Sequence, residues 1–291
     1  MWVRALGFAA LVAGLAWMAL SVRHADEELE QARAELLRRW EHESASMGAD
    51  ERDLAGRVAR WVAGGTGEYA GDFVADELPA QTGLRDVLKR PMVYVRGALA
   101  DLRTPQWMKE STREAGRDAL LLCLLDPPDG RAEMDLVRRT LSAYGNDERM
   151  RKATAHVRPL GPALVGLSVL DPVWRGRVVE AKDRRRLGVL GRILDQAPLE
   201  EARQAARASL LLFAIDEPGE LSAPPELDGE RPHHIRLGLV DLTTQKELVR
   251  FRRRVDPSWL SDSTRAELAR GVDDCTLAFD LRQALSQGSL R

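Results

Sequence analysis

The sequence predicts an α/β protein, with α+β as the alternative, in which an N-terminal transmembrane helix and a helical stalk precede a mixed β-sheet domain. Three observations support this fold class. Residues 5–22 form an uncharged apolar run, residues 23–65 show helical spacing of apolar positions, and residues 91–291 alternate short apolar runs with amphipathic stretches. The order of these stretches predicts a sheet flanked by helices, with a C-terminal hairpin and a closing helix.

The composition is that of an ordinary globular protein. The chain has 291 residues, of which 44% are hydrophobic and 30% are charged, and its formal net charge is -2. This length is sufficient for a hydrophobic core, and the near-neutral charge gives no basic excess that would attract nucleic acid. We therefore expect no nucleic-acid partner.

Residues 5–22 are predicted to be a transmembrane signal-anchor helix that follows a cytoplasmic stub of residues 1–4. With Trp2 and Val3 the run approaches the roughly 20 residues that a helix needs to cross a bilayer. A cleaved signal peptide is the alternative. The run is longer than the usual apolar region of a signal peptide, about 7 to 15 residues, and no convincing small-residue cleavage site follows it. We expect this segment to contact the lipid bilayer.

The orientation depends on two opposing indications. More arginines follow the apolar run than precede it, which favours a cytoplasmic domain. The same flank is rich in Asp and Glu, and long domains translocate largely regardless of charge. The excess of Arg over Lys, with abundant Ala and Gly, suggests a bacterial source. We therefore predict a single-pass protein of the bacterial inner membrane with its C-terminal domain in the periplasm.

Residues 23–65 are predicted to be a helical stalk, and residues 66–90 a linker or loop-rich joint. Leu29, Leu36 and Trp40 recur near helical spacing over residues 26–47, and Asp50 begins a second amphipathic helix that ends at two glycines. The first helix is too short to establish a coiled coil, which needs at least three or four heptads.

In residues 91–291, continuous apolar runs predict buried strands at 92–97, 119–125 and 210–216, and two alternating segments around a Thr-Thr-Gln turn predict a hairpin. Helices are predicted after Thr104-Pro105, from Asp129 or Gly130 to Gly145, after Asp171-Pro172, after Pro198, and near the C-terminus. Met134, Val137 and Leu141 are expected on one face of their helix, and the helix after Asp171 is expected to be long.

The segment LLLFAIDEPGE, residues 210–220, resembles the strand that carries the magnesium-binding Asp and the catalytic Glu of ATP-binding-cassette ATPases. A nucleotide site also requires a phosphate-binding GxxxxGK[ST] loop, and no lysine in this chain follows a glycine. We therefore expect no nucleotide and no other cofactor. The similar segment ALLLCLLDPPDG, from residue 119, instead favours two buried strands that each end at an acidic residue and a proline.

One set of residues could form a metal site. Asp216 and Glu217 lie across a loop from His233 and His234, which would suit an extracytoplasmic metal-assisted hydrolase. Adjacent histidines on a strand point to opposite faces, so at most one joins such a site easily. The chain has no GxSxG motif. A serine hydrolase of that type is therefore not expected, and the metal-assisted hydrolase is the enzyme alternative.

The two cysteines have no CxxC spacing and are too few for a disulfide framework. We expect them to be buried, and a disulfide between Cys123 and Cys275 remains open if the domain lies in an oxidising compartment.

The RFRRRV segment is the most distinctive surface feature. Arg250, Arg252 and Arg254 share one face of a predicted strand, and Arg236 on the partner strand extends it. Such a stripe could bind an anionic envelope polymer or a protein partner, or it could be a solvated face neutralised by nearby acids.

The last ~80 residues are similar, as a pattern of elements, to the α/β modules of some periplasmic assembly and activator lipoproteins. We expect a membrane-anchored, non-catalytic binding or scaffold component of a bacterial envelope complex.

Overall fold

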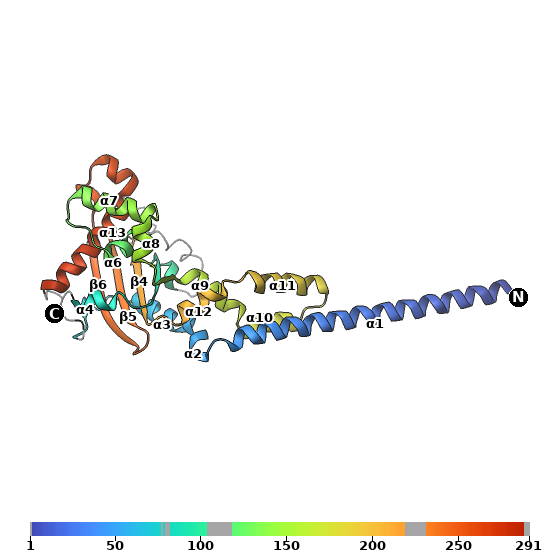
Figure 1. The fold of residues 1–291 in the computed structure, drawn as a ribbon. Coiled ribbons are helices and arrows are strands. Elements are labelled where there is room, and N and C mark those ends of the chain that lie inside the picture. Colours follow the sequence, from blue (N-terminus) through green and yellow to red (C-terminus); the bar gives the residue numbers. More distant parts are fainter. Residues whose placement is uncertain (1, 77, 79–81, 104–117, 219–230, 288–291) are drawn as a thin grey trace. The chain divides into compact units, whose positions relative to one another are not determined.

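The computed structural model describes residues 2–76, 78, 82–103, 118–218 and 231–287. Its elements are drawn in Figure 1. The chain divides into two compact units: residues 1–48 with 167–197, and residues 49–166 with 198–291. The domain boundaries predicted between residues 65 and 66 and between residues 90 and 91 do not coincide with these units. Residues 49–65 of the expected stalk belong to the unit with the sheet, and residues 167–197 of the expected domain belong to the unit with the first helix.

The first unit is helical. It contains α1 (Trp2–Ala45), α10 (Pro172–Val179) and α11 (Arg184–Gln196), and α10 and α11 form a hairpin beside α1 (Figure 1). Trp40 is buried here, and its Nε1 donates to the carbonyl oxygen of Val169 at 2.9 Å. The helix predicted over residues 26–47 is confirmed as far as Ala45, and the buried Leu36 lies beside Gly191 of α11.

The predicted membrane span falls in the first half of α1. The backbone of residues 5–22 is helical, but the side chains of residues 2–16 and 18–21 lie outside the described part of the structure. Among the residues that are described, no helix combines the length and the apolarity needed to cross a membrane.

The prediction of a single long helix after Asp171 is wrong, because this segment forms two helices. The predicted start is confirmed, because the Asp171 side chain accepts from the backbone N–H of Val173, but α10 ends at Val179. Asp183 then adopts an extended conformation (φ -150, ψ 158) and accepts from the N–H of Arg186 at 2.7 Å. A second N-cap begins a second helix, and this turn is what folds α11 back along α10.

The second unit is built on a mixed sheet. Within the described residues six strands form the order β1-β6-β5-β4-β2-β3, in which β2 is parallel to β3 and β4 and the other pairs are antiparallel. The mixed sheet and the hairpin are therefore confirmed. Edge strand β1 comes from the segment predicted as a linker. The strands are β1 (Phe73–Val74), β2 (Met92–Ala98), β3 (Val157–Pro159), β4 (Leu210–Asp216), β5 (His233–Asp241) and β6 (Lys246–Val255).

Helices cover both faces of this sheet. Phe213 and Ile215 point toward α3, whereas Leu212 and Ala214 on the opposite side join the main hydrophobic core with α6 and α13. The closing helix is a single helix, as predicted. The helices of this unit, together with α9 at its boundary, are α2 (Ala49–Arg52), α3 (Leu54–Gly65), α4 (Thr82–Val87), α6 (Ala119–Leu125), α7 (Glu133–Tyr144), α8 (Glu148–Ala153), α9 (Leu160–Val169), α12 (Leu199–Ala206) and α13 (Asp262–Gln287).

The strand predicted over residues 119–125 is wrong, because this segment is helix α6. Asp118 begins the helix by accepting from the N–H of Leu120 at 2.9 Å. Residues 119–124 are all buried, so the segment has no polar face from which helical periodicity could be recognised. The similar segment over residues 210–216 does form a strand, β4.

The apolar face predicted for α7 packs against the core only at Val137, which is partly buried. Met134 and Leu141 are exposed, whereas Leu136 and Ala143 are buried. The end expected at Gly145 is confirmed, since Gly145 is the C-cap of α7. The helix predicted after Thr104-Pro105 lies outside the described residues.

A disulfide joins Cys123 of α6 to Cys275 of α13. The two residues are 152 positions apart in the sequence, and their Cα atoms are 5.0 Å apart, within the range that a disulfide requires. Both cysteines are fully buried. The pairing that the sequence left open therefore links the covering helices of the sheet across half the chain.

Candidate functional site

A small cavity lies over the hairpin on the α3 side of the sheet. It has a volume of about 220 Å³. We call it the hairpin pocket. Its apolar walls include Trp61, Tyr69, Phe213 and Leu237, and its charged groups are Glu68, Glu247, Arg236 and Arg250.

Two glycines make room for the Phe213 ring in this pocket. A Cβ atom on Gly238, the cross-strand partner of Phe213, would lie 2.0 Å from the ring atom Cζ. A Cβ atom on Gly65, at the end of α3, would lie 2.6 Å from Cε2 of the same ring. Only glycine therefore lets the sheet and α3 close around Phe213 without displacing it.

Arg236 is held rigidly at the rim of the hairpin pocket. Its Nη1 donates to the carbonyl oxygen of Gly65 at 2.9 Å and to that of Gly67. Its guanidinium also pairs with Glu217, which in turn accepts from Nε of Arg252 at 2.7 Å. The Arg236 and Arg252 guanidinium carbons each lie 5.6 Å from the centroid of the Tyr69 ring. Arg236 therefore orders the loop after α3.

Arg250 is different, because it retains a donor without an acceptor. Its Nη2 lies 3.4 Å from Oε2 of Glu247, whereas its Nε is buried and has no hydrogen-bond partner in the described part of the chain. Burial raises the pKa of Glu247, and Arg250 partly opposes this shift. A buried donor without an acceptor is destabilising, and this donor belongs to a residue that lines the hairpin pocket.

The four arginines of the predicted stripe do share one face of the hairpin. Arg236 lies directly opposite Arg252, and Arg254 opposite His234. Each of the four has a carboxylate within ion-pairing distance, from Glu217, Glu247 or Asp256. Three carboxylates therefore offset most of the positive charge of the four arginines, and the pocket beside Arg250 is the most distinctive part of the stripe.

The residues of the alternative metal site lie on different sides of the sheet. His233 is buried with its Nε2 4.0 Å from Oδ1 of Asp216, on the α13 side. Glu217 pairs with Arg236 and Arg252 on the other side, next to His234. Burial lowers the pKa of His234, and the charge of Arg252 adds to the effect. Over the described ranges, no group of three or more His, Cys, Asp or Glu side chains is arranged to hold a metal ion.

A buried charge cluster on the α13 side was missed from the sequence. Arg96 of β2 donates to both oxygens of Asp216, from Nε at 3.0 Å and Nη2 at 2.8 Å, and its Nη1 lies 2.7 Å from Oδ2 of Asp274. The same Nη1 also bonds Asp118, which accepts from the Tyr94 hydroxyl at 2.7 Å. An arginine inside the apolar strand MVYVRGA was the available signal, because a buried cation needs carboxylate partners.

The carboxylates of this cluster differ in protonation. Arg96 holds the pKa of Asp216 below its usual value despite burial. Burial raises the pKa of Asp273 to about 8, with the neighbouring Asp274 adding to the shift. Oδ2 of Asp273 and Oδ1 of Asp274 are buried without hydrogen-bond partners among the described residues. The cluster therefore joins β2, β4, α6 and α13 and retains protons near neutral pH, but its side chains are inaccessible to a ligand.

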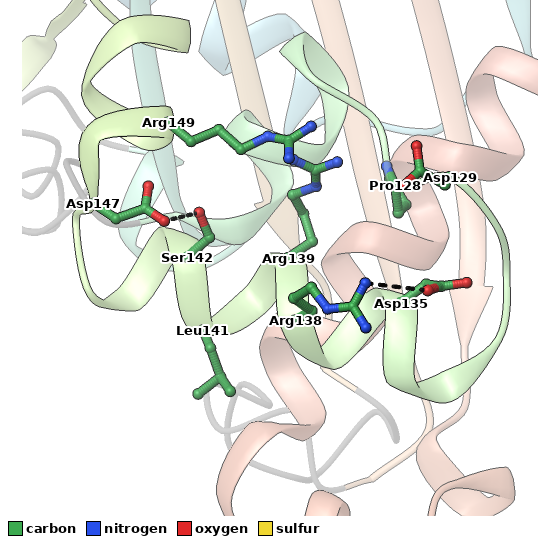
Figure 2. A pocket seen from close by; sticks show the side chains of 9 residues that line it. All are labelled: Pro128, Asp129, Asp135, Arg138, Arg139, Leu141, Ser142, Asp147 and Arg149. Atoms are coloured by element: carbon green, nitrogen blue, oxygen red, sulfur yellow. Dashed lines mark hydrogen bonds and ion pairs between the residues drawn. The ribbon is translucent and has the colours of Figure 1, made fainter.

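A second cavity, of about 430 Å³, lies beside α7 (Figure 2). Arg139 and Arg149 both bind Asp126, Arg138 pairs with Asp135, and Ser142 donates to Asp147. The three arginines of this cavity are thus each paired with a carboxylate. Its lining consists of Pro128, Asp129, Asp135, Arg138, Arg139, Leu141, Ser142, Asp147 and Arg149.

No protein-family model, no curated protein and no solved structure matches this chain.

Proposed function

We propose that this protein is a membrane-anchored, non-catalytic binding component of a bacterial envelope complex, and that the hairpin pocket receives one side chain of a partner protein. The observation that carries the proposal is the combination of aromatic walls with Arg250, whose buried Nε has no hydrogen-bond partner among the residues that the structure describes. Pockets of this kind are mostly apolar, with a few polar groups that orient the ligand.

The pocket size suggests what would bind. Pockets for drug-sized ligands are commonly about 300 Å³ or larger, so a cavity of about 220 Å³ suits a single side chain better than a nucleotide. An aromatic or large aliphatic side chain would contact Trp61 and Phe213. A backbone carbonyl or carboxylate of the same partner segment would then accept from Arg250. Buried aromatic anchors of this kind supply much of the binding energy in protein interfaces.

Two observations support an extracytoplasmic location for the second unit. The uncharged run over residues 5–22 suits a signal-anchor, and the Cys123–Cys275 disulfide suits an oxidising compartment such as the periplasm. A periplasmic reporter enzyme fused after Arg291 would test this location. We expect an active reporter, and an inactive one would contradict the proposed topology.

Partner capture tests the pocket. The tagged full-length protein would be cross-linked in its native membrane, solubilised and purified, with the captured partners quantified by mass spectrometry. We expect Trp61→Ala and Arg250→Gln each to reduce the specific partner by about tenfold or more, as for interface anchor residues. Arg138→Gln, an exposed arginine of the second cavity, is the matched control. Equal capture by all three variants and the unmodified protein would refute the hairpin pocket as the binding site.

A further inference from the structure

The turn between α10 and α11 carries a dense basic cluster. We call Lys182, Asp183, Arg184, Arg185 and Arg186 the basic tip; all five residues are exposed. Within the first unit, Nη2 of Arg33 donates to the carbonyl oxygen of Ala181 at 2.7 Å, and Nη1 of Arg184 donates to Glu28 at 2.6 Å. These contacts place the tip beside the segment of α1 that follows the apolar run.

The direction of the hairpin is fixed by contacts along α1. At the other end of α11, Asp195 pairs with Arg39 of α1, whereas Arg184 at the tip pairs with Glu28. The tip therefore points toward the N-terminal half of α1 (Figure 1). Glu28 is six residues beyond Val22, the last residue of the apolar run, which corresponds to a rise of ~9 Å.

This distance places the level of Glu28 just beyond the polar layer of a membrane. The headgroup region extends roughly 5–7 Å beyond the hydrocarbon on each side, and arginine and lysine side chains can extend their charges toward such a surface. Attraction to an anionic bilayer persists over about one Debye length, ~8 Å at physiological salt. Basic side chains level with Glu28 are therefore within range of lipid headgroups if residues 5–22 span the bilayer.

Three charges of the basic tip are available. Arg184 is paired with Glu28, but no described residue forms an ion pair with Lys182, Arg185 or Arg186. The carboxylate of Asp183 accepts from the backbone N–H of Arg186 and so serves as the N-cap of α11. Three arginines also occupy the first turn of α11, where the helix macrodipole disfavours cations. Helix stability therefore does not explain why arginines occupy this turn. An anion outside the protein could pair with their charges.

The basic tip also reverses the local charge balance. Residues 23–33 of α1 contain four carboxylates and two arginines, a net charge of -2 that would be repelled by an anionic surface. Residues 182–186 contain four basic side chains and one aspartate, a net charge of +3. The folded hairpin therefore makes the segment next to the apolar run net positive.

We infer that the basic tip binds the headgroups of anionic phospholipids in the membrane that holds α1. This inference rests on the proposed membrane anchor and adds a lipid-binding surface distinct from the hairpin pocket. The contact would hold the α10–α11 hairpin and the following part of α1 against the bilayer surface.

Lipid proximity can be measured on the full-length protein through a label at Gly188→Cys. Gly188 is exposed, a Cβ atom there meets nothing within 4 Å, and both native cysteines are in the disulfide. The spin-labelled protein would be reconstituted into vesicles of phosphatidylcholine alone, or into vesicles in which phosphatidylglycerol makes up about one third of the lipid. Collisions with a lipid-soluble and a water-soluble relaxing agent would then report the depth of the label.

In vesicles with phosphatidylglycerol we expect the label to collide more often with the lipid-soluble agent and less often with the water-soluble agent. Because each basic residue near an anionic surface strengthens attachment about fivefold, Arg185→Gln/Arg186→Gln should lower the ratio of attached to free tip roughly 25-fold. Arg175→Gln/Arg192→Gln removes the same charge from exposed positions of the same hairpin outside the basic tip and should have a much smaller effect.

Two outcomes would overturn the inference while leaving the anchor intact. One is the same label depth in both types of vesicle, and the other is that Arg175→Gln/Arg192→Gln weakens tip attachment as much as Arg185→Gln/Arg186→Gln. Flotation of the vesicles after washing at high pH tests the anchor separately. Protein that does not float with the vesicles would refute the membrane anchor and the lipid contact together.

Discussion

Arg96 and Asp216 form a two-point ion pair between neighbouring parallel strands, at 3.0 Å and 2.8 Å, with both side chains almost completely buried. The remaining guanidinium nitrogen, Nη1, binds Asp118 and Asp274. A single cation thus organises three carboxylates from two helices and a strand. Removing one partner from a buried ion pair costs more than the pair contributes, because the remaining charge is desolvated without compensation.

Arg96→Met is therefore expected to lower the free energy of unfolding by about 3–5 kcal/mol. The loss should be smaller at low pH, where protonation neutralises the carboxylates left behind. Urea unfolding of the full chain in detergent would measure it. Arg138→Met, at an exposed arginine, is the control and should change stability by less than about 0.5 kcal/mol. A loss of less than about 1 kcal/mol for Arg96→Met would contradict this role.

The protonation of Asp273 predicts a pH dependence of stability. The folded protein holds this proton up to a pKa of about 8, because the side chain is buried and lies near Asp274. The unfolded chain releases it near pH 4. The contribution of Asp273 to the free energy of unfolding should therefore decrease as pH rises from about 4 to about 8, and then level off.

Melting temperatures measured across this pH range would check the slope. Asp273→Asn removes the titrating group, so its melting temperature should fall less between pH 5 and pH 8, about the range in which Asp273 acts. The lowered pKa values of Asp126 and Asp216 act in the opposite sense and only at low pH, below the usual range of a carboxyl group. An unchanged slope in Asp273→Asn would show that Asp273 does not hold the proton.

Reduction of the Cys123–Cys275 disulfide should destabilise the second unit. The bond closes a long loop, with a sequence separation of 152, and such bonds commonly contribute roughly 2–5 kcal/mol. Unfolding with and without dithiothreitol would measure the loss, and the Cys123→Ala/Cys275→Ala variant should not respond to the reductant. Two free thiols in the denatured, unreduced protein would contradict the pairing.

Gly238→Ala should destabilise the hairpin by about 1–3 kcal/mol, because the new Cβ atom overlaps the Phe213 ring. Phe213→Leu in the same chain should recover part of the loss, since a smaller side chain leaves room for the methyl group. Gly176→Ala in α10 is the control: a Cβ atom there meets nothing, and alanine is the better helix former. Thermal unfolding of Gly238→Ala, Phe213→Leu, the double variant and Gly176→Ala would reveal the coupling between residues 213 and 238. Additive effects of the first two substitutions in the double variant would refute it.

The sequence predicted elements wherever local chemistry was sufficient. Strand β4, the hairpin and helix α12 followed from continuous apolar runs, alternation, and a proline with acidic residues at a helix start. The run over residues 119–125 was assigned to a strand instead of a helix because a segment buried on all sides shows no periodicity. The apolar residues of α7 did not identify its buried face, because Met134 and Leu141 are exposed.

The sequence by itself determined the uncharged run of residues 5–22, strand β4, the closing helix and the hairpin with its arginines. The tertiary structure decided which charges meet. It brought Asp118, Asp216 and Asp274 to Arg96, paired Cys123 with Cys275, and left Arg250 Nε without an acceptor among the described residues. The physical reason is that these contacts join residues far apart in the chain. Sheet register and helix packing determine their distances, and neither can be calculated from local spacing.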